Sequence, residues 1–154
     1  MIRLTVVPDL IEGNGIEAIP AAIGLGEAAR LWAAGGEGAL AVVDAAGRLS
    51  GLIDATAIVR ALAKDGPGAL DRPVGTALQG AVDVLAPGDS GLDALELMRL
   101  RAVDHLPVAD ADGRLLGIVS RRRLCDLLHR CLEREFDRQA AGVFGTPDPG
   151  CDPG

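Results

Sequence analysis

Three consecutive arginines follow a serine at residues 120–123, and their spacing suits the binding of an anion. Ser120 stands before an amphipathic segment, where a serine favours the start of a helix, and Arg121, Arg122 and Arg123 then fall in the first turn. A helix N-terminus offers free N–H groups and a partial positive charge, to which guanidinium groups add full charges. The pattern favours a phosphate-bearing ligand. The alternative is a solvated helix start whose arginines pair with carboxylates such as Asp126.

Two further patterns could do chemistry, and each has a plainer interpretation. Cys125 and His129 have the spacing of two metal ligands on a helix, but His105 would have to join them from another element. We therefore prefer a buried Cys and a partly exposed His, and predict no metal site. Residues 24–29 match the G-x-G-x-x-A pattern of dinucleotide-binding folds, although Pro20 interrupts the strand that should precede it.

No combination of residues in the sequence is typical of an enzyme active site. The sequence has no G-x-S-x-G elbow and no phosphate-binding glycine loop, and its two histidines are the only imidazole bases. A formal net charge of −7 opposes wrapping around a nucleic-acid backbone, because that affinity comes from an excess of Lys and Arg. We expect neither an enzyme nor a nucleic-acid-binding protein.

Cysteine spacing and hydropathy predict the compartment. Three cysteines, at 125, 131 and 151, show no paired spacing, so a disulfide framework is not expected and Cys151 is interpreted as a free thiol. No stretch approaches the roughly 18 apolar residues of a membrane span. These observations predict a cytoplasmic protein that does not enter a membrane.

The elements that must position Ser120 belong to an internal repeat. Residues 41–53, AVVDAAGRLSGLI, recur without a gap as residues 107–119, PVADADGRLLGIV. Gly47 aligns with Gly113, which sets the offset at 66 residues. Such self-similarity indicates one structural unit that occurs twice.

Periodicity predicts the same order of elements in both repeats: strand, helix, β-hairpin, helix. In the second repeat these are a strand at 82–85, a helix after 89–90, a hairpin of strands 105–109 and 115–119, and a helix after Ser120. In the first repeat they are a strand at 16–19, a helix at 25–34, a hairpin across 44–48, and a helix after Asp54. We predict repeat 1 at 8–64, a linker at 65–73, repeat 2 at 74–134 and a mobile tail at 135–154.

The repeated unit resembles the cystathionine-beta-synthase (CBS) domain. The resemblance is carried by HLPV at 105–108 and by D-x-x-GRL-x-GIVS at 110–120, with ALELM at 94–98 before them, and it covers residues 8–134. It implies an α/β (α+β) fold of two β-α-β-β-α repeats, packed about a pseudo-twofold axis as a stand-alone tandem pair. It also implies a homodimer, and clefts between the units that bind adenosyl compounds.

The family's ligand motif is Ser/Thr-x-x-Asp at the start of the last helix, where the carboxylate holds the ribose hydroxyls. This sequence has Ser120 and Arg123 at the motif positions of the second repeat, and Asp54 and Ala57 at those of the first, which makes the first a degenerate site. The candidate ligand-binding residues that the resemblance implies are Val82, Val84, His105, Leu106, Pro107, Val119, Ser120, Arg121 and Arg123.

The resemblance therefore implies a regulatory module and not an enzyme. We expect it to bind an adenosyl nucleotide or another anion in the cleft at the second repeat, without a required cofactor. The candidate regulatory ligands are AMP, ADP, ATP and S-adenosylmethionine. The ligand would shift the packing of the two halves, and an effector protein would read that change. The alternative is an interaction or dimerisation module that has lost nucleotide binding.

Overall fold

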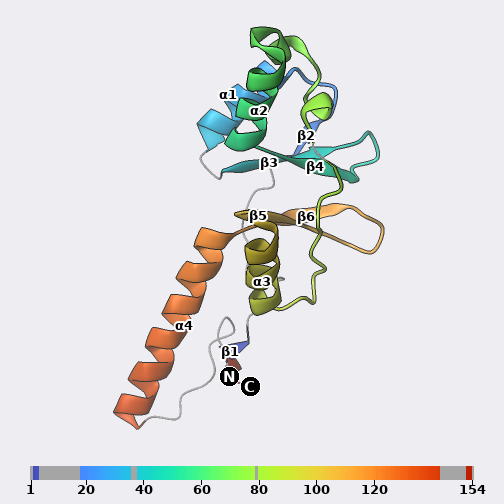
Figure 1. The fold of residues 1–154 in the computed structure, drawn as a ribbon. Helices are drawn as coiled ribbons and strands as arrows, with labels where there is room; N and C mark the ends of the chain where they lie inside the picture. The colour runs from blue at the N-terminus through green and yellow to red at the C-terminus, as the bar shows by residue number, and fades with distance from the viewer. Residues whose placement is uncertain (1, 4–17, 36–37, 79, 143–151, 154) are drawn as a thin grey trace.

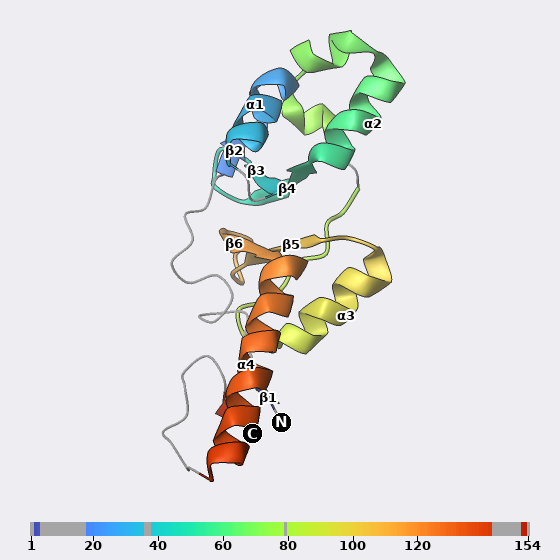
Figure 2. The same cartoon turned by 90° about the vertical axis from the view of Figure 1, so that its left-hand side faces the viewer.

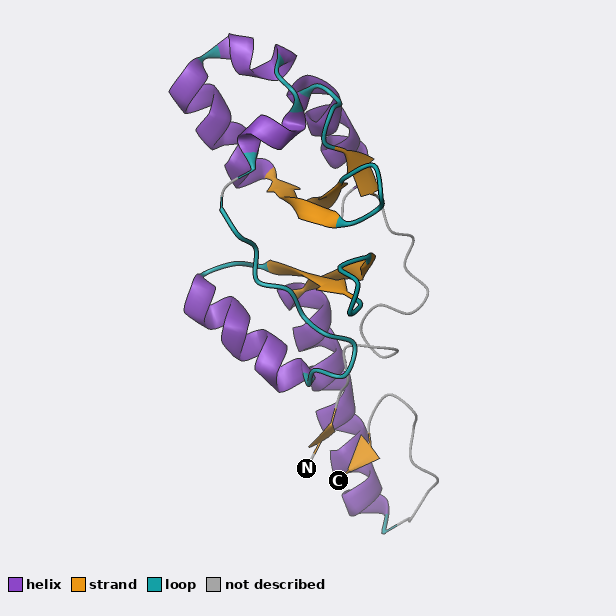
Figure 3. Ribbon diagram, turned by 90° about the vertical axis from the view of Figure 1, so that its right-hand side faces the viewer, coloured by secondary structure: helices purple, strands orange, loops and turns teal. Residues whose placement is uncertain are grey.

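Two lobes, one from each repeat, make up most of the described chain (Figure 1). This computed structural model describes residues 2–3, 18–35, 38–78, 80–142 and 152–153. Each lobe is a small sheet with its helices on one side, and the two sheets lie between the two sets of helices (Figure 3). The predicted α+β fold class is confirmed.

The first lobe contains a three-stranded sheet in the order β2-β3-β4. Its elements are β2 (Ala18–Pro20), α1 (Leu25–Gly35), β3 (Ala39–Val43), β4 (Leu49–Asp54), α2 (Ala55–Asp65) and the 3-10 helices η2 (Pro67–Asp71) and η3 (Val74–Ala77). β2 is parallel to β3, and β3 is antiparallel to β4. The helices cover one face of this sheet (Figure 2). Leu25, Leu40, Ile53 and Val74 form the centre of the lobe's apolar core.

The segment predicted as a linker packs against the first lobe. Ala69 of η2 is buried, and the Leu25 N–H donates to the Arg72 carbonyl at 2.8 Å. α1 approaches η2 so closely that a Cβ on Gly26 would lie 3.3 Å from the Leu70 carbonyl oxygen. Gly26, the second glycine of the G-x-G-x-x-A pattern, therefore has a packing role that needs no dinucleotide.

The second lobe is a β-hairpin covered by two helices. Its elements are α3 (Gly91–Arg101), β5 (His105–Ala109), β6 (Leu115–Ser120) and α4 (Arg121–Ala141). β5 and β6 are antiparallel. The core contains Met98 from α3, Leu106, Val108 and Val119 from the strands, and Leu124 from α4. The apolar runs of the hairpin and Leu124 are buried as predicted, whereas Leu92 and Leu100 of α3, which helical spacing places on the buried face, are 51% and 64% exposed.

The strand predicted at 82–85 is wrong, because only Leu85 pairs with the sheet. Its N–H donates to the Pro107 carbonyl at 2.9 Å. A parallel pair would continue through an N–H of residue 107 to the carbonyl of Asp83, but proline has no N–H. The first repeat has Ala41 at the equivalent position, and there β2 forms a strand.

The two hairpins meet where equivalent residues face each other. Arg48 and Arg114 form an antiparallel bridge, and the Leu49 N–H donates to the Gly113 carbonyl at 3.1 Å. Because Arg48 and Arg114 occupy the same position in their repeats, this bridge relates the two hairpins by a local twofold axis. The contact joins the two sheets. At the starts of β3 and β5, Gly38 and His105 lie next to each other across the lobe boundary.

The last helix, α4, extends well past α3 (Figure 1). Leu124 is buried in the lobe, whereas Leu132 and Phe136 are 59% and 73% exposed. The mobile tail predicted at 135–154 is therefore wrong for residues 135–141, which belong to α4. Residues 143–151 and 154 of that segment lie outside the described part. β1 (Ile2–Arg3) pairs with β7 (Asp152–Pro153). No helix in the described ranges is long and apolar enough to cross a membrane.

Candidate functional site

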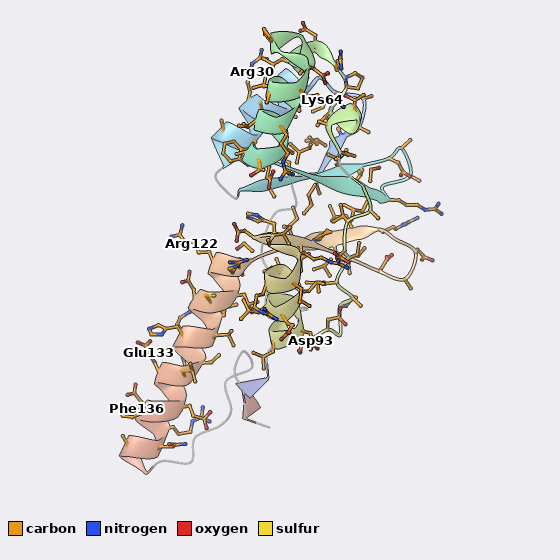
Figure 4. All side chains as sticks on the ribbon, viewed as in Figure 1. Arg30, Lys64, Asp93, Arg122, Glu133 and Phe136 are labelled. Atoms are coloured by element: carbon orange, nitrogen blue, oxygen red, sulfur yellow. The ribbon has the colours of Figure 1, made fainter. Side chains whose placement is uncertain are left out.

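A cavity of about 830 Å³ opens beside the start of α4. Residues of both lobes line it: Gly38, which precedes β3, comes from the first lobe, and the other lining residues come from the second. The lining residues are Gly38, Asp104, His105, Ser120, Arg121, Arg122, Arg123, Cys125, Asp126 and Arg130. Arg122 lies at the end of α4 nearest the first lobe (Figure 4). We call this cavity the α4 pocket.

The helix start itself is largely satisfied by the protein. The Ser120 hydroxyl accepts a hydrogen bond from the Arg123 N–H at 3.2 Å, as expected of an N-cap serine. The Arg121 N–H donates to the Asp104 carbonyl at 2.8 Å. Two of the backbone N–H groups that the sequence predicted to be free for an anion therefore donate to protein atoms instead. The guanidinium groups of the arginine side chains are then the main donors to a ligand.

The arginines of the α4 pocket differ in how firmly they are held. Arg121 donates from Nη2 to the Val103 carbonyl at 3.0 Å, and its Nε lies 3.3 Å from Asp104 Oδ1, an ion-pair distance at which Nε makes no hydrogen bond. Within the described ranges, no ion pair neutralises Arg122 or Arg123. These two guanidinium groups are therefore available to a ligand.

The α4 pocket is a positive region on an acidic protein. Four arginines and two aspartates line it, so its formal charge is +2 when His105 is neutral. The whole chain has a formal net charge of −7. A pocket of this sign attracts anions, and its partial enclosure strengthens the attraction relative to open water.

The structure brings together four of the predicted site residues, His105, Ser120, Arg121 and Arg123. The other five do not line the α4 pocket. Leu106, Pro107 and Val119 are buried in the lobe, Val82 is half-buried, and Val84 is 46% exposed. The apolar wall expected around an adenine ring is thus not part of this cavity.

Sequence reasoning about a ligand site missed other lining residues. Arg130 lies seven residues after Arg123, which is two helical turns, so helical periodicity could have found it. Gly38 belongs to the first repeat and is equivalent to Asp104 of the second. The twofold relation of the repeats brings these equivalent positions together, which a local pattern does not reveal.

The degenerate position in the first repeat has opposite electrostatics. The Asp54 carboxylate caps α2 by accepting a hydrogen bond from the Ala57 N–H at 2.8 Å. The first turn of α2 contains no charged residue. A negative cap with no nearby cation in that turn repels a phosphate, whatever the shape of the surface.

The cysteines depart from their predicted roles. Cys125 is exposed rather than buried, and it is a free thiol that lines the α4 pocket. Cys131 is disulfide-bonded, contrary to the prediction from cysteine spacing. Cys151, which was predicted to be a free thiol, lies outside the described residues. His129 is exposed and lies 3.2 Å from Glu133. Over the ranges that the structure describes, no group of three or more His, Cys, Asp or Glu could hold a metal ion.

Comparison with known protein families identifies the second repeat. A family model described as the CBS domain matches residues 80–130. A protein of 17.7 kDa from Acidianus ambivalens is 32% identical over 109 residues, which cover 71% of this chain and 65% of that protein. A CBS domain-containing protein from Dictyostelium discoideum is 50% identical over 42 residues, 27% of this chain and 29% of that one. The chain therefore spans less than two thirds of each relative.

Solved structures with a similar fold include CBS-domain proteins. One from Agrobacterium tumefaciens has a TM-score of 0.68 and 28% identity, covering 75% of this chain and 85% of that chain. A CBS domain pair solved with 5-methylthioadenosine and S-adenosyl-L-methionine has a TM-score of 0.72 at 21% identity, covering 82% and 97%. A third structure, solved with AMP, has a TM-score of 0.71 at 21% identity, covering 86% and 98%.

Proposed function

Because this chain belongs to the CBS-domain family and forms a tandem pair of these domains, we propose that it is a regulatory module that senses a small ligand. The ligand is a phosphate-bearing molecule, such as an adenine nucleotide, bound in the α4 pocket. The observation that carries this proposal is the cluster of four arginines lining a cavity in an otherwise acidic chain. Two solved structures of similar fold hold AMP or S-adenosylmethionine, which supports a nucleotide-sized ligand.

The ligand is held through its phosphate. Arg123 stands where the family motif places a carboxylate, and a guanidinium group has no acceptor for ribose hydroxyl hydrogens. Arg122 and Arg123, which have no ion-pair partner among the described side chains, can each give a phosphate two parallel hydrogen bonds. Binding therefore depends on the anionic end of the molecule.

Ligand binding would act by shifting the packing of the two lobes. Gly38 comes from the first lobe, whereas His105 and the arginines come from the second. A ligand that fits one relative position of the lobes better than another favours that position by its difference in affinity. An effector protein that contacts both lobes would read the change. This module has no catalytic step of its own.

Thermal unfolding with and without ligand tests the proposal. A ligand that binds only the folded state raises the melting temperature. At a concentration of 100 times its Kd, it adds about 2.7 kcal/mol to the free energy of unfolding. We expect ATP, ADP or AMP at millimolar concentration to raise it, and Arg122→Gln to reduce the rise. Arg30→Gln is the matched control, because Arg30 is exposed on α1 in the other lobe (Figure 4). No rise with any phosphate-bearing ligand would overturn the proposal.

A second candidate function is homodimerisation through α4. Cys125, His129, Leu132 and Phe136 are all exposed and follow the alternating four- and three-residue spacing of a helix-pairing seam. We propose that two copies pair along this face. Light scattering should give a dimer mass for the natural chain and a monomer mass for Phe136→Asp. A natural chain that is monomeric at micromolar concentration would remove this candidate.

A further inference from the structure

On the basis of the proposed function, we infer that the α4 pocket recognises a chain of phosphates and is indifferent to a nucleoside. The ligand class is a linear polyphosphate, either inorganic or as the phosphate arm of a nucleoside triphosphate. The inference rests on three features of the pocket: the chemistry of its lining, the spread of its arginines and its charge.

No aliphatic side chain, and no Phe, Tyr or Trp, lines the α4 pocket. Eight of its ten residues are Arg, Asp, His or Ser, and the other two are Gly38 and Cys125. Purine rings are normally held between aliphatic or aromatic side chains, which supply most of the binding energy for that part of a ligand. The nearby apolar residues Leu106 and Val119 are 2% and 0% exposed, so their side chains lie in the protein core.

The arginines extend along the helix rather than surrounding one point. Arg123 and Arg130 are seven residues apart, which places their Cα atoms about 10 Å apart along the axis of α4. Arg130 is anchored loosely, with its Nε 3.4 Å from the Asp126 carbonyl. A single phosphate engages one end of this row, whereas a triphosphate presents successive anionic groups along it.

The charge of the α4 pocket sets the charge of its ligand. Asp104 already balances Arg121, at 3.3 Å, and Asp126 adds a second negative charge to the lining. The two remaining positive charges require at least two negative charges from the ligand before the site is neutral. A polyphosphate supplies them, whereas adenosine supplies none and S-adenosylmethionine carries a sulfonium cation that the arginines repel.

Isothermal titration of the full chain at constant ionic strength, without divalent cations, tests the inference. The ligands are inorganic tripolyphosphate, pyrophosphate, ATP, GTP, 2′-deoxy-ATP, AMP, adenosine and S-adenosylmethionine. We expect the dissociation constants of the four triphosphates to lie within about threefold of one another. The dissociation constant of AMP should be at least about tenfold higher, as the loss of one charged hydrogen bond implies. Adenosine and S-adenosylmethionine should not bind.

Variants assign the binding to the arginines. Arg123→Gln should weaken tripolyphosphate about tenfold, and it keeps the backbone N–H that Ser120 caps. Arg122→Gln, at an exposed position, provides a second variant with the same expectation. Arg123→Asp should abolish tripolyphosphate binding and weaken AMP binding, because it replaces a phosphate donor by a like charge. Arg30→Gln should leave every affinity unchanged.

The outcomes separate this inference from the proposed function. If ATP or AMP binds and tripolyphosphate does not, the pocket requires the nucleoside, so the inference is overturned and the proposed function stands. If none of the phosphate compounds binds, both are overturned. Tripolyphosphate binding that is unchanged in both Arg122→Gln and Arg123→Gln would also overturn the inference, since the ligand would then lie elsewhere.

Discussion

Replacing Gly38 by alanine should destabilise the contact between the lobes at the α4 pocket. Gly38 has φ of +83°, in the region that favours glycine, and an added Cβ would lie 2.8 Å from Cε1 and Nε2 of the His105 ring. Real Cβ atoms do not approach a ring so closely, so either the backbone before β3 or the His105 side chain must move. The substitution therefore combines backbone strain with a clash across the lobe boundary.

Gly113→Ala measures the backbone strain alone. Gly113 has a similar φ of +81°, but no atom lies within 4 Å of its added Cβ. An alanine in the left-handed region costs roughly 1–2 kcal/mol. The clash at Gly38 adds about 1–3 kcal/mol, the usual cost of overpacking. For a chain of this size, that addition lowers the melting temperature by roughly 2–12 °C below that of Gly113→Ala.

A double-mutant cycle in urea denaturation shows whether the clash with His105 is the cause. In a His105→Ala background the ring is absent, so Gly38→Ala should then cost the same as Gly113→Ala to within about 0.5 kcal/mol. If Gly38→Ala and Gly113→Ala cost the same in the natural chain, Gly38 makes no special contact and the reasoning fails. An equal extra cost with and without the ring would also refute it.

Two other predictions concern the caps and the missing strand. Ser120→Ala and Asp54→Ala should each lower the free energy of unfolding by about 1 kcal/mol in chemical denaturation, because each removes the acceptor of one N-terminal amide; an unchanged stability in both would contradict the capping roles. Pro107→Ala should supply the N–H that can reach the Asp83 carbonyl, so hydrogen exchange at position 107 should be slow; rapid exchange there would show that the strand is absent for another reason.

The repeat predicted the fold because its signals are local. The turn of each hairpin depends on one aspartate, Asp44 or Asp110, whose carboxylate accepts backbone N–H groups within the turn at 2.8–2.9 Å. Each following glycine has positive φ. Such patterns act within five residues, so they can be recognised from one sequence. The same holds for Ser120 as a helix cap.

The features that the sequence did not predict depend on contacts between distant residues. The strand at 82–85 is lost through the missing donor of Pro107, more than twenty residues away in the sequence. Gly38 joins the α4 pocket through the twofold relation of the lobes, and Leu106 leaves the predicted site because β5 directs it into the core. These three features depend on which strands pair and on which face of the sheet each side chain lies, and neither can be recognised from a local pattern.

The two helix starts show how a symmetrical fold can hold an asymmetrical site. They occupy equivalent positions, yet the segment 54–57 has a formal charge of −1 and the segment 120–123 has a charge of +3. Both starts are capped by a side chain at the same position, Asp54 or Ser120, so capping alone does not explain the difference. Basic residues in a first turn are unfavourable to the helix itself. Their presence in one repeat alone supports the proposed ligand role at that site. A phosphate bound at the start of α4 would have no counterpart at the start of α2.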